Sequence, residues 1–97
     1  MSEKVAIVGG GILGMTAALR IAEKGYRVEL FDAAPELGGL TRAWKIDNIT
    51  WDKFYHVVLL SDTYTRKIIS EIGLGNEFNW VETKTGFYSG GKLYSLY

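Results

Sequence analysis

The stretch VAIVGGGILGMTAALRIAEKGYRVELFD, residues Val5 to Asp32, decides the fold. It opens with an apolar run that stops at glycine, which is typical of a parallel strand buried on both faces. From about Ile12, apolar residues recur at helical spacing until Gly25 supplies a stop. A second strand is predicted over Arg27–Phe31.

A strand, a helix and a strand within so short a stretch form a right-handed crossover unit. Such a unit places the two strands side by side and parallel in one sheet. The predicted fold class is therefore α/β, with a Rossmann-like start.

The first turn of this unit carries the pattern G-x-G-x-x-G at Gly9, Gly11 and Gly14. The first glycine permits the tight turn, the second lets the main chain approach a diphosphate, and the third lets the helix pack close to the strand. The start of the helix adds N–H groups and the positive end of its dipole. This context predicts a dinucleotide-binding loop.

An acidic residue is expected where the second strand of such a unit ends, and Asp32 occupies that place. Its carboxylate would accept hydrogen bonds from ribose hydroxyls and would repel a 2′-phosphate, which disfavours NADP. The alternative is a purely structural glycine turn in which Asp32 caps a loop.

Composition excludes several other functions. Eleven basic residues balance eleven acidic ones without a basic cluster, so nucleic acid is not an expected partner. The chain has no cysteine, which excludes disulfides and thiolate metal sites and fits a reducing cytoplasm. No apolar run reaches membrane-spanning length. The 97 residues match the size of one domain.

Weaker signals follow the crossover unit. A loop is predicted over DAAPELGG, Asp32 to Gly39, then a hairpin turning at Asp47 and Asn48. A helix capped by Ser61 or Asp62 is predicted to carry Ile68, Ile69 and Ile72 inward, and the chain ends in a hairpin turning at Gly90 and Gly91. The aromatic residues of the last segment are expected to be core, and they are Trp80, Phe87, Tyr88, Tyr94 and Tyr97.

The segment Val5–Arg42 resembles the N-terminus of FAD-dependent oxidoreductases of the amine oxidase, protoporphyrinogen oxidase and phytoene desaturase type. In that family a glycine pair shortly after the acidic residue lies against the cofactor, and Gly38 and Gly39 match it. The resemblance implies FAD as cofactor, with NAD as the alternative. The predicted cofactor-binding residues are Gly9, Gly11, Ile12, Gly14, Asp32, Gly38, Gly39 and Thr41.

The sequence departs from the family pattern directly after the second glycine pair. Many amine oxidase relatives carry Arg directly after the glycine pair, whereas this chain has Leu40 and reaches Arg42 only after Thr41, which leans toward the desaturase-like branch. His56, the only histidine, matches a family position near the flavin or substrate entrance, but no partner for it is visible in the sequence. We expect it to be a structural residue packed among its neighbours.

Two functions of different classes remain. The first is the N-terminal part, residues 1–97, of an FAD-binding domain in a flavoenzyme whose flavin accepts hydride from a C–N or C–C bond. A doubly wound sheet needs at least a third strand, so this domain is expected to be truncated, inactive alone and prone to self-association through its sheet. The second is a non-catalytic NAD- or ADP-binding regulatory module. A vestigial fragment without ligand is a third possibility. No catalytic residue and no metal site is predicted.

Overall fold

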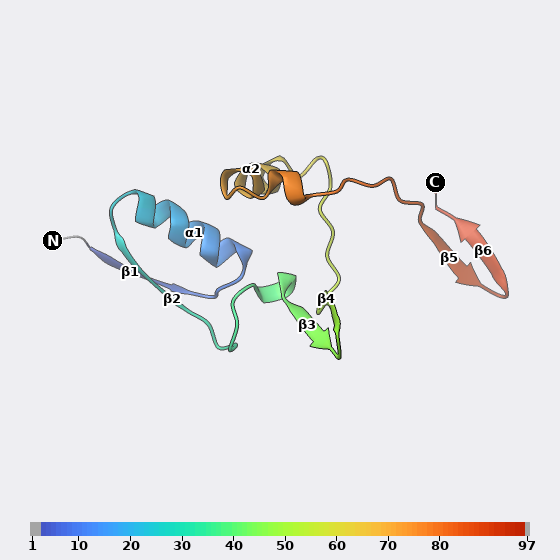
Figure 1. The fold of residues 1–97 in the computed structure, drawn as a ribbon, viewed down its shortest axis with the longest axis horizontal. Coiled ribbons are helices and arrows are strands. Elements are labelled where there is room, and N and C mark those ends of the chain that lie inside the picture. The colour runs from blue at the N-terminus through green and yellow to red at the C-terminus, as the bar shows by residue number, and fades with distance from the viewer. Residues whose placement is uncertain (1–2, 97) are drawn as a thin grey trace. The chain divides into compact units, whose positions relative to one another are not determined.

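The computed structural model describes residues 3–96. The chain divides into two compact units, Met1–Val57 and Val58–Tyr97, which we term the first and second unit. The first contains the predicted crossover unit and one hairpin, and the second contains the later helix and the last hairpin (Figure 1).

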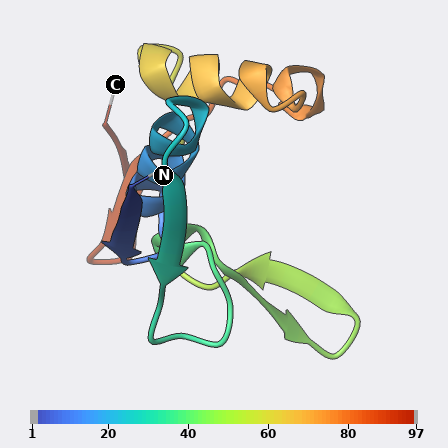
Figure 2. The same cartoon turned by 90° about the vertical axis from the view of Figure 1, so that its left-hand side faces the viewer.

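The first unit begins with the predicted strand–helix–strand. Strand β1 spans Lys4–Val8, helix α1 spans Ile12–Glu23 and strand β2 spans Arg27–Phe31. The two strands pair in parallel, with Val5 opposite Val28 and Ile7 opposite Leu30. Helix α1 lies along this strand pair (Figures 1 and 2). The predicted α/β start is confirmed.

The two faces of the β1–β2 sheet differ in burial. Val5, Ile7, Val28 and Leu30 are half-buried, which fits the cover that α1 provides. Residues of the opposite face are exposed, and Val8 keeps 87% of its surface accessible. The expectation of a strand buried on both faces is therefore wrong, because nothing among residues 3–96 covers the second face.

The remainder of the first unit is a loop followed by a hairpin. A short 3₁₀ turn, η1, spans Gly39–Thr41, so a regular element begins inside the stretch predicted to be loop. Strands β3, Ala43–Ile46, and β4, Ile49–Asp52, pair antiparallel. Asp47 lies in the turn with a φ of 54°, a left-handed conformation that Asp tolerates. The predicted hairpin is confirmed.

The second unit starts with helix α2, Thr63–Glu71, followed by the 3₁₀ turn η2, Gly75–Glu77. Asp62 occupies the predicted cap position, but its carboxylate accepts from the N–H of Leu59 at 2.7 Å, and no side-chain bond caps the helix. The predicted position of the cap is therefore confirmed, but the predicted capping hydrogen bond is absent. No helix within residues 3–96 has the length and apolar character needed to cross a membrane.

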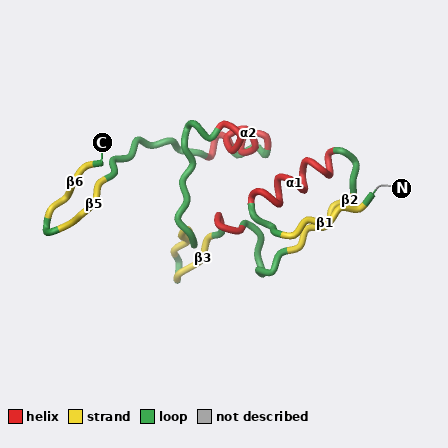
Figure 3. Tube along the Cα trace, turned by 180° about the vertical axis from the view of Figure 1, so that it is seen from behind, coloured by secondary structure: helices red, strands yellow, loops and turns green. Residues whose placement is uncertain are grey.

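An irregular segment, drawn as loop in Figure 3, leads from η2 to the last hairpin. Strands β5, Gly86–Ser89, and β6, Lys92–Ser95, pair antiparallel around Gly90 and Gly91, as predicted. The rings of Phe87 and Tyr94 stack across the two strands, with centroids 4.9 Å apart. Cross-strand contact of this kind stabilises a hairpin without requiring burial.

The predicted core residues of the second unit are not buried. Ile72 is 55% exposed and lies outside the half-buried pair Ile68 and Ile69. The aromatic side chains expected to be core are also exposed, at 41% for Trp80, 49% for Phe87, 72% for Tyr88 and 44% for Tyr94, while Tyr97 lies outside the described residues. The prediction for the helix is therefore confirmed in part, by the half-buried Ile68 and Ile69, and is wrong for Ile72. The prediction for the four described aromatic side chains is wrong, because residues 3–96 contain no buried apolar side chain.

Gly14 lies in the first turn of α1, beside the end of β1. A Cβ atom here would lie 1.7 Å from the carbonyl oxygen of Gly9 and 3.5 Å from Cγ2 of Ile7. The oxygen belongs to the backbone and cannot move aside as the tip of a flexible side chain could. Gly14 therefore permits the close approach of helix and strand that the motif predicts.

We predict that Gly14→Ala destabilises the chain by about 1–3 kcal/mol, because the added methyl overpacks a backbone contact. In an unhindered helix interior the same change would stabilise by about 1 kcal/mol. Urea unfolding followed by far-UV circular dichroism measures the effect. Gly11→Ala is the matched control, since its Cβ would lie 3.8 Å from Cα of Gly39, an ordinary contact. It should cost at most about 1 kcal/mol through weaker N-capping. A Gly14→Ala chain as stable as the wild type would contradict this packing.

Candidate dinucleotide-binding site

The first glycine loop, Gly9–Gly11, joins the end of β1 to the start of α1. Gly9 has a φ of +111°, which side chains rarely adopt, and its N–H donates to the carbonyl of Phe31 at 2.7 Å. The first intrahelical bond runs from the N–H of Met15 to the carbonyl of Gly11. The N–H groups of residues 12–14 therefore have no intrahelical partner, and they stand at the positive end of the helix dipole.

Gly11 differs from the other two glycines of the motif. Its φ of −76° and ψ of −174° suit any residue, and a Cβ there would meet only an ordinary contact. The fold of the described residues therefore does not require glycine at this position. The motif explains glycine at this position by the close approach of a diphosphate to the main chain, and this explanation stays a prediction.

Asp32 follows β2, and its carboxylate reaches the first glycine loop. Oδ2 accepts from the N–H of Gly10 at 2.7 Å, and Oδ1 accepts from the N–H of Ala34 at 2.7 Å. The bonds from Ala34 and Gly10, together with the positive charge of Arg42, hold the pKa of the Asp32 carboxyl below its usual value of 3.8. The side chain is thus a fixed anion that joins the end of β2 to the loop.

The second glycine pair packs directly on the first glycine loop. The N–H of Gly38 donates to the carbonyl of Gly10 at 2.8 Å. A Cβ on Gly39, whose φ is +55°, would lie 2.9 Å from Cα of Gly11. The second glycine pair thus lies against the first loop, and its predicted contact with a cofactor stays a prediction.

Gly10 is a site residue that the sequence analysis missed. It is the only buried residue among those described, and it bonds both Asp32 and Gly38. A Cβ on Gly10 would lie 2.4 Å from Cδ2 of Leu37 and 3.1 Å from Oδ2 of Asp32. The available signal was the run of three consecutive glycines, of which the motif uses only the outer two.

The remaining predicted site residues lie at the edges of the two loops. Ile12 begins α1 and is 49% exposed. The hydroxyl of Thr41 donates to the carbonyl of Gly38 at 2.7 Å, so it closes η1. Arg42 is half-buried, and its Nε donates to the carbonyl of Gly39 at 3.1 Å. Thr41 and Arg42 therefore stabilise the second glycine pair.

His56 has two partners that the sequence did not reveal. Its Nδ1 lies 2.9 Å from the carbonyl of Phe54, and its Nε2 lies 3.8 Å from Oδ1 of Asp52. The side chain is one-third exposed. Because a carbonyl only accepts, Nδ1 carries the proton that makes the first contact. These two contacts restrain the irregular segment after β4, and a structural role for His56 stays a prediction.

The family described as "NAD(P)-binding Rossmann-like domain" matches residues 7–72, which include both glycine loops, Asp32 and helix α2. The chain belongs to this family. The assignment agrees with the parallel β1–α1–β2 unit and with the glycine loop between β1 and α1.

The chain is also similar to individual curated proteins, among them two desaturases. The chain is 35% identical over 69 residues to the 4,4'-diapophytoene desaturase (4,4'-diaponeurosporene-forming) of Staphylococcus haemolyticus, an overlap of 71% of this chain and 14% of the relative. It is 36% identical over 61 residues to the protein of the same name in Staphylococcus aureus, covering 63% of this chain and 12% of the relative. The chain thus spans a small part of the length of the relatives it matches.

The arrangement suits one class of ligand chemistry in this Rossmann-like family. The start of α1 offers backbone N–H donors of the kind that bind a diphosphate, and Asp32 offers carboxylate acceptors at the end of β2. No group of three or more His, Asp or Glu side chains within residues 3–96 is placed to hold a metal ion.

The lowered pKa of Asp32 has a testable consequence. Because the pKa of Asp32 is lower in the folded state, its ionised carboxylate stabilises the fold at pH values above the unfolded-state pKa of 3.8. This stabilisation is lost as the pH falls through the folded-state pKa. We predict that the free energy of unfolding declines below pH 3.8 and that Asp32→Asn reduces this decline while lowering stability at neutral pH. Glu82→Gln, which removes an exposed carboxylate in the second unit, should keep the wild-type pH profile. Identical profiles for wild type and Asp32→Asn would contradict the assignment.

Proposed function

We propose that this chain binds the ADP half of FAD through the two glycine loops and Asp32. The observation that carries the proposal concerns Gly11. The fold has space for a side chain at this position, yet the residue there is glycine. Absence of a Cβ at this point benefits a ligand that approaches the main chain. The proposed contact residues are Gly9, Gly11, Ile12, Gly14, Asp32, Gly38, Gly39 and Thr41.

Asp32 has acceptor capacity left for a ribose. Each of its oxygens accepts one backbone N–H, whereas a carboxylate offers about four lone-pair sites. The side chain is exposed, so a sugar hydroxyl can reach it. In this proposal the backbone bonds orient the carboxylate, and the remaining lone pairs accept from the ribose hydroxyls.

FAD is favoured over NAD by the similarity to desaturases together with the resemblance to FAD-dependent oxidoreductases in residues 5–42. We infer that the chain is the dinucleotide-binding front part of such an oxidoreductase. Flavin supplies the capacity to accept a hydride from a C–N or C–C bond when it is bound. The residues of this chain contribute binding and orientation, and we expect the 97-residue chain alone to be inactive.

A regulatory NAD- or ADP-binding module is the second candidate. The description of the matching family, which names NAD(P), favours it. Such a module acts by shifting an assembly equilibrium when its nucleotide binds, and it needs no flavin. The preferred dinucleotide therefore separates the two candidates.

We predict that the purified chain binds FAD more tightly than NAD, measured by isothermal titration calorimetry. Gly11→Ala should weaken FAD binding by about tenfold or more, because the new methyl occupies the place of the diphosphate. Gly75→Ala is the matched control, since its Cβ would make only ordinary contacts, the nearest 3.5 Å from Cα of Ser70.

Three results would contradict the proposal. Binding of NAD without FAD would favour the regulatory module. Binding of neither dinucleotide by a folded chain would exclude both candidates. Equal loss of affinity in Gly11→Ala and Gly75→Ala would show that the first glycine loop is not the binding site.

The β1–β2 sheet has a further consequence for the isolated chain. It is a two-stranded sheet, so each strand has an unpaired edge, and its uncovered face exposes Val8 and Phe31 at 87% and 51%. Unpaired edges and exposed apolar faces favour association between chains. We infer that this chain self-associates in isolation through the β1–β2 sheet.

Sedimentation velocity over a range of concentrations measures this association, and we predict species larger than a monomer at high concentration. Val8→Lys should reduce the association by placing a charge on the uncovered face. Val81→Lys, at a position 67% exposed in the second unit, should leave it unchanged. A sharp monomer boundary at high concentration would contradict the inference.

A further inference from the structure

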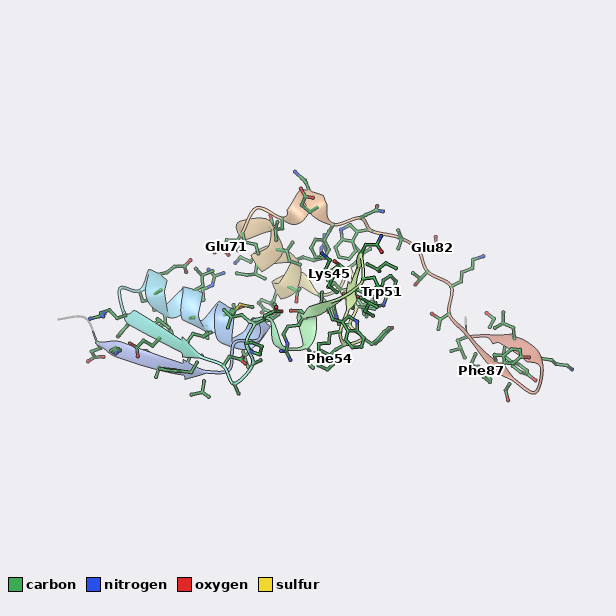
Figure 4. All side chains as sticks on the ribbon, turned by 60° about the horizontal axis from the view of Figure 1, so that its bottom comes forward. Lys45, Trp51, Phe54, Glu71, Glu82 and Phe87 are labelled. Carbon is green, nitrogen blue, oxygen red and sulfur yellow. The ribbon has the colours of Figure 1, made fainter. Side chains whose placement is uncertain are left out.

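Arg42 lies between the second glycine pair and the β3–β4 hairpin, and it makes contacts with both. Its Nε donates to the carbonyl of Gly39 at 3.1 Å. Its Cζ lies 5.9 Å from the ring centroid of Phe54, a residue shortly after β4 that Figure 4 labels. Its carbonyl accepts from the N–H of Lys53 at 2.9 Å. Arg42 therefore connects the hairpin to a segment of the candidate site.

The aliphatic stem of Arg42 lies close to the other member of the glycine pair. A Cβ atom on Gly38 would lie only 3.0 Å from Cγ of Arg42. Gly38 in turn donates its N–H to the carbonyl of Gly10 at 2.8 Å. The side chain of Arg42 thus approaches Gly38 with its stem and bonds Gly39 with its Nε. These contacts restrain the pair where it meets the first glycine loop.

The positive charge of Arg42 also acts on Asp32. The N–H groups of Ala34 and Gly10 lower the pKa of the Asp32 carboxyl most, and the charge of Arg42 lowers it further, while burial opposes them. None of the ion pairs recorded among residues 3–96 joins Arg42 to Asp32, so this charge acts at longer range. Arg42 is therefore near both anchors of the site, the carboxylate and the second glycine pair.

We propose that Arg42 is a positioning residue of the dinucleotide site, which holds Gly38 and Gly39 in place for the ligand from the β3–β4 hairpin. The inference rests on the proposed function, because it assigns the second glycine pair to the ligand. A planar guanidinium can donate through Nε while it lies over an aromatic ring, and a Lys ammonium cannot reproduce this geometry. The hairpin thus contributes to dinucleotide affinity through Arg42 without contacting the ligand.

The test is calorimetric titration of the full 97-residue chain with FAD and with ADP, in Arg42→Lys and Arg42→Gln. Arg42→Lys keeps the charge and loses the guanidinium, whereas Arg42→Gln loses both. Each variant should weaken binding about three- to tenfold, because each removes the bond that holds Gly39.

Lys45→Gln is the matched control. It removes an exposed cation from the same hairpin, and strand alternation places Lys45 and its partner Thr50 on the face opposite the Trp44–Trp51 pair. Its affinity for FAD and ADP should equal that of the wild type. Circular dichroism checks that each variant keeps the wild-type secondary structure.

NMR of the ligand-free chain separates positioning from overall stability. The amides of Gly38 and of Leu40, which shares a peptide group with the carbonyl of Gly39, should shift in both Arg42 variants. The pKa of the Asp32 carboxyl, followed by its ¹³C shift, should rise toward its usual value in Arg42→Gln and stay lowered in Arg42→Lys. A loss of global stability alone would not distinguish the two variants in this way.

Several outcomes would overturn the role of Arg42. Wild-type affinity in both Arg42 variants would do so, as would an equal loss of affinity in Lys45→Gln. Full affinity in Arg42→Lys alone would show that charge suffices and that positioning by the guanidinium does not matter. If the wild-type chain binds neither FAD nor ADP, the proposed function fails, and the NMR arm then decides separately. Unshifted Gly38 and Leu40 amides would overturn the contact with the glycine pair, and shifted amides would support it.

Discussion

The hydrogen bond from the N–H of Gly10 to the carboxylate of Asp32 is the contact on which the candidate site depends. It joins the loop after β1 to the end of β2, and the carbonyl of Gly10 meanwhile accepts from Gly38. One buried glycine therefore connects the first glycine loop to two points more than twenty residues further along the chain, Asp32 and Gly38. A side chain at Gly10 would collide with Leu37 and Asp32, so this connection requires a bare backbone.

Backbone bonds and glycine contacts, rather than apolar burial, shape the site. Residues 3–96 contain no buried apolar side chain, yet a hydrogen bond from Gly38 to Gly10 joins the two glycine loops, and a Cβ on Gly39 would collide with Gly11. In the proposed function this contact places backbone N–H donors and one oriented carboxylate where an adenine dinucleotide presents its diphosphate and ribose.

Local signals in the sequence predicted most of the secondary structure. The crossover unit was located by the glycines at its strand ends, and the two hairpins by the pairs Asp47–Asn48 and Gly90–Gly91. These signals suffice because turn chemistry is encoded within a few residues. Burial was predicted wrongly for Val8, and also for Trp80, because it depends on what covers a face rather than on residue type. The partners of Gly10 were missed because contacts across a fold leave no local pattern. The partners of His56 are only two and four residues away, but they lie at the end of β4 and in the irregular segment after it, where no helical or strand period predicts contacts.

The central claim is that the Asp32-anchored loop at Gly10 and the start of α1 form the dinucleotide site. Its most direct test is a ¹⁵N–¹H NMR titration of the labelled chain with FAD, read at the backbone amides. We predict that the largest shifts occur at the amides of Gly11 to Gly14, while those of the β5–β6 hairpin stay unchanged. Shifts confined to the hairpin, or unchanged glycine-loop amides at saturating FAD, would contradict the account.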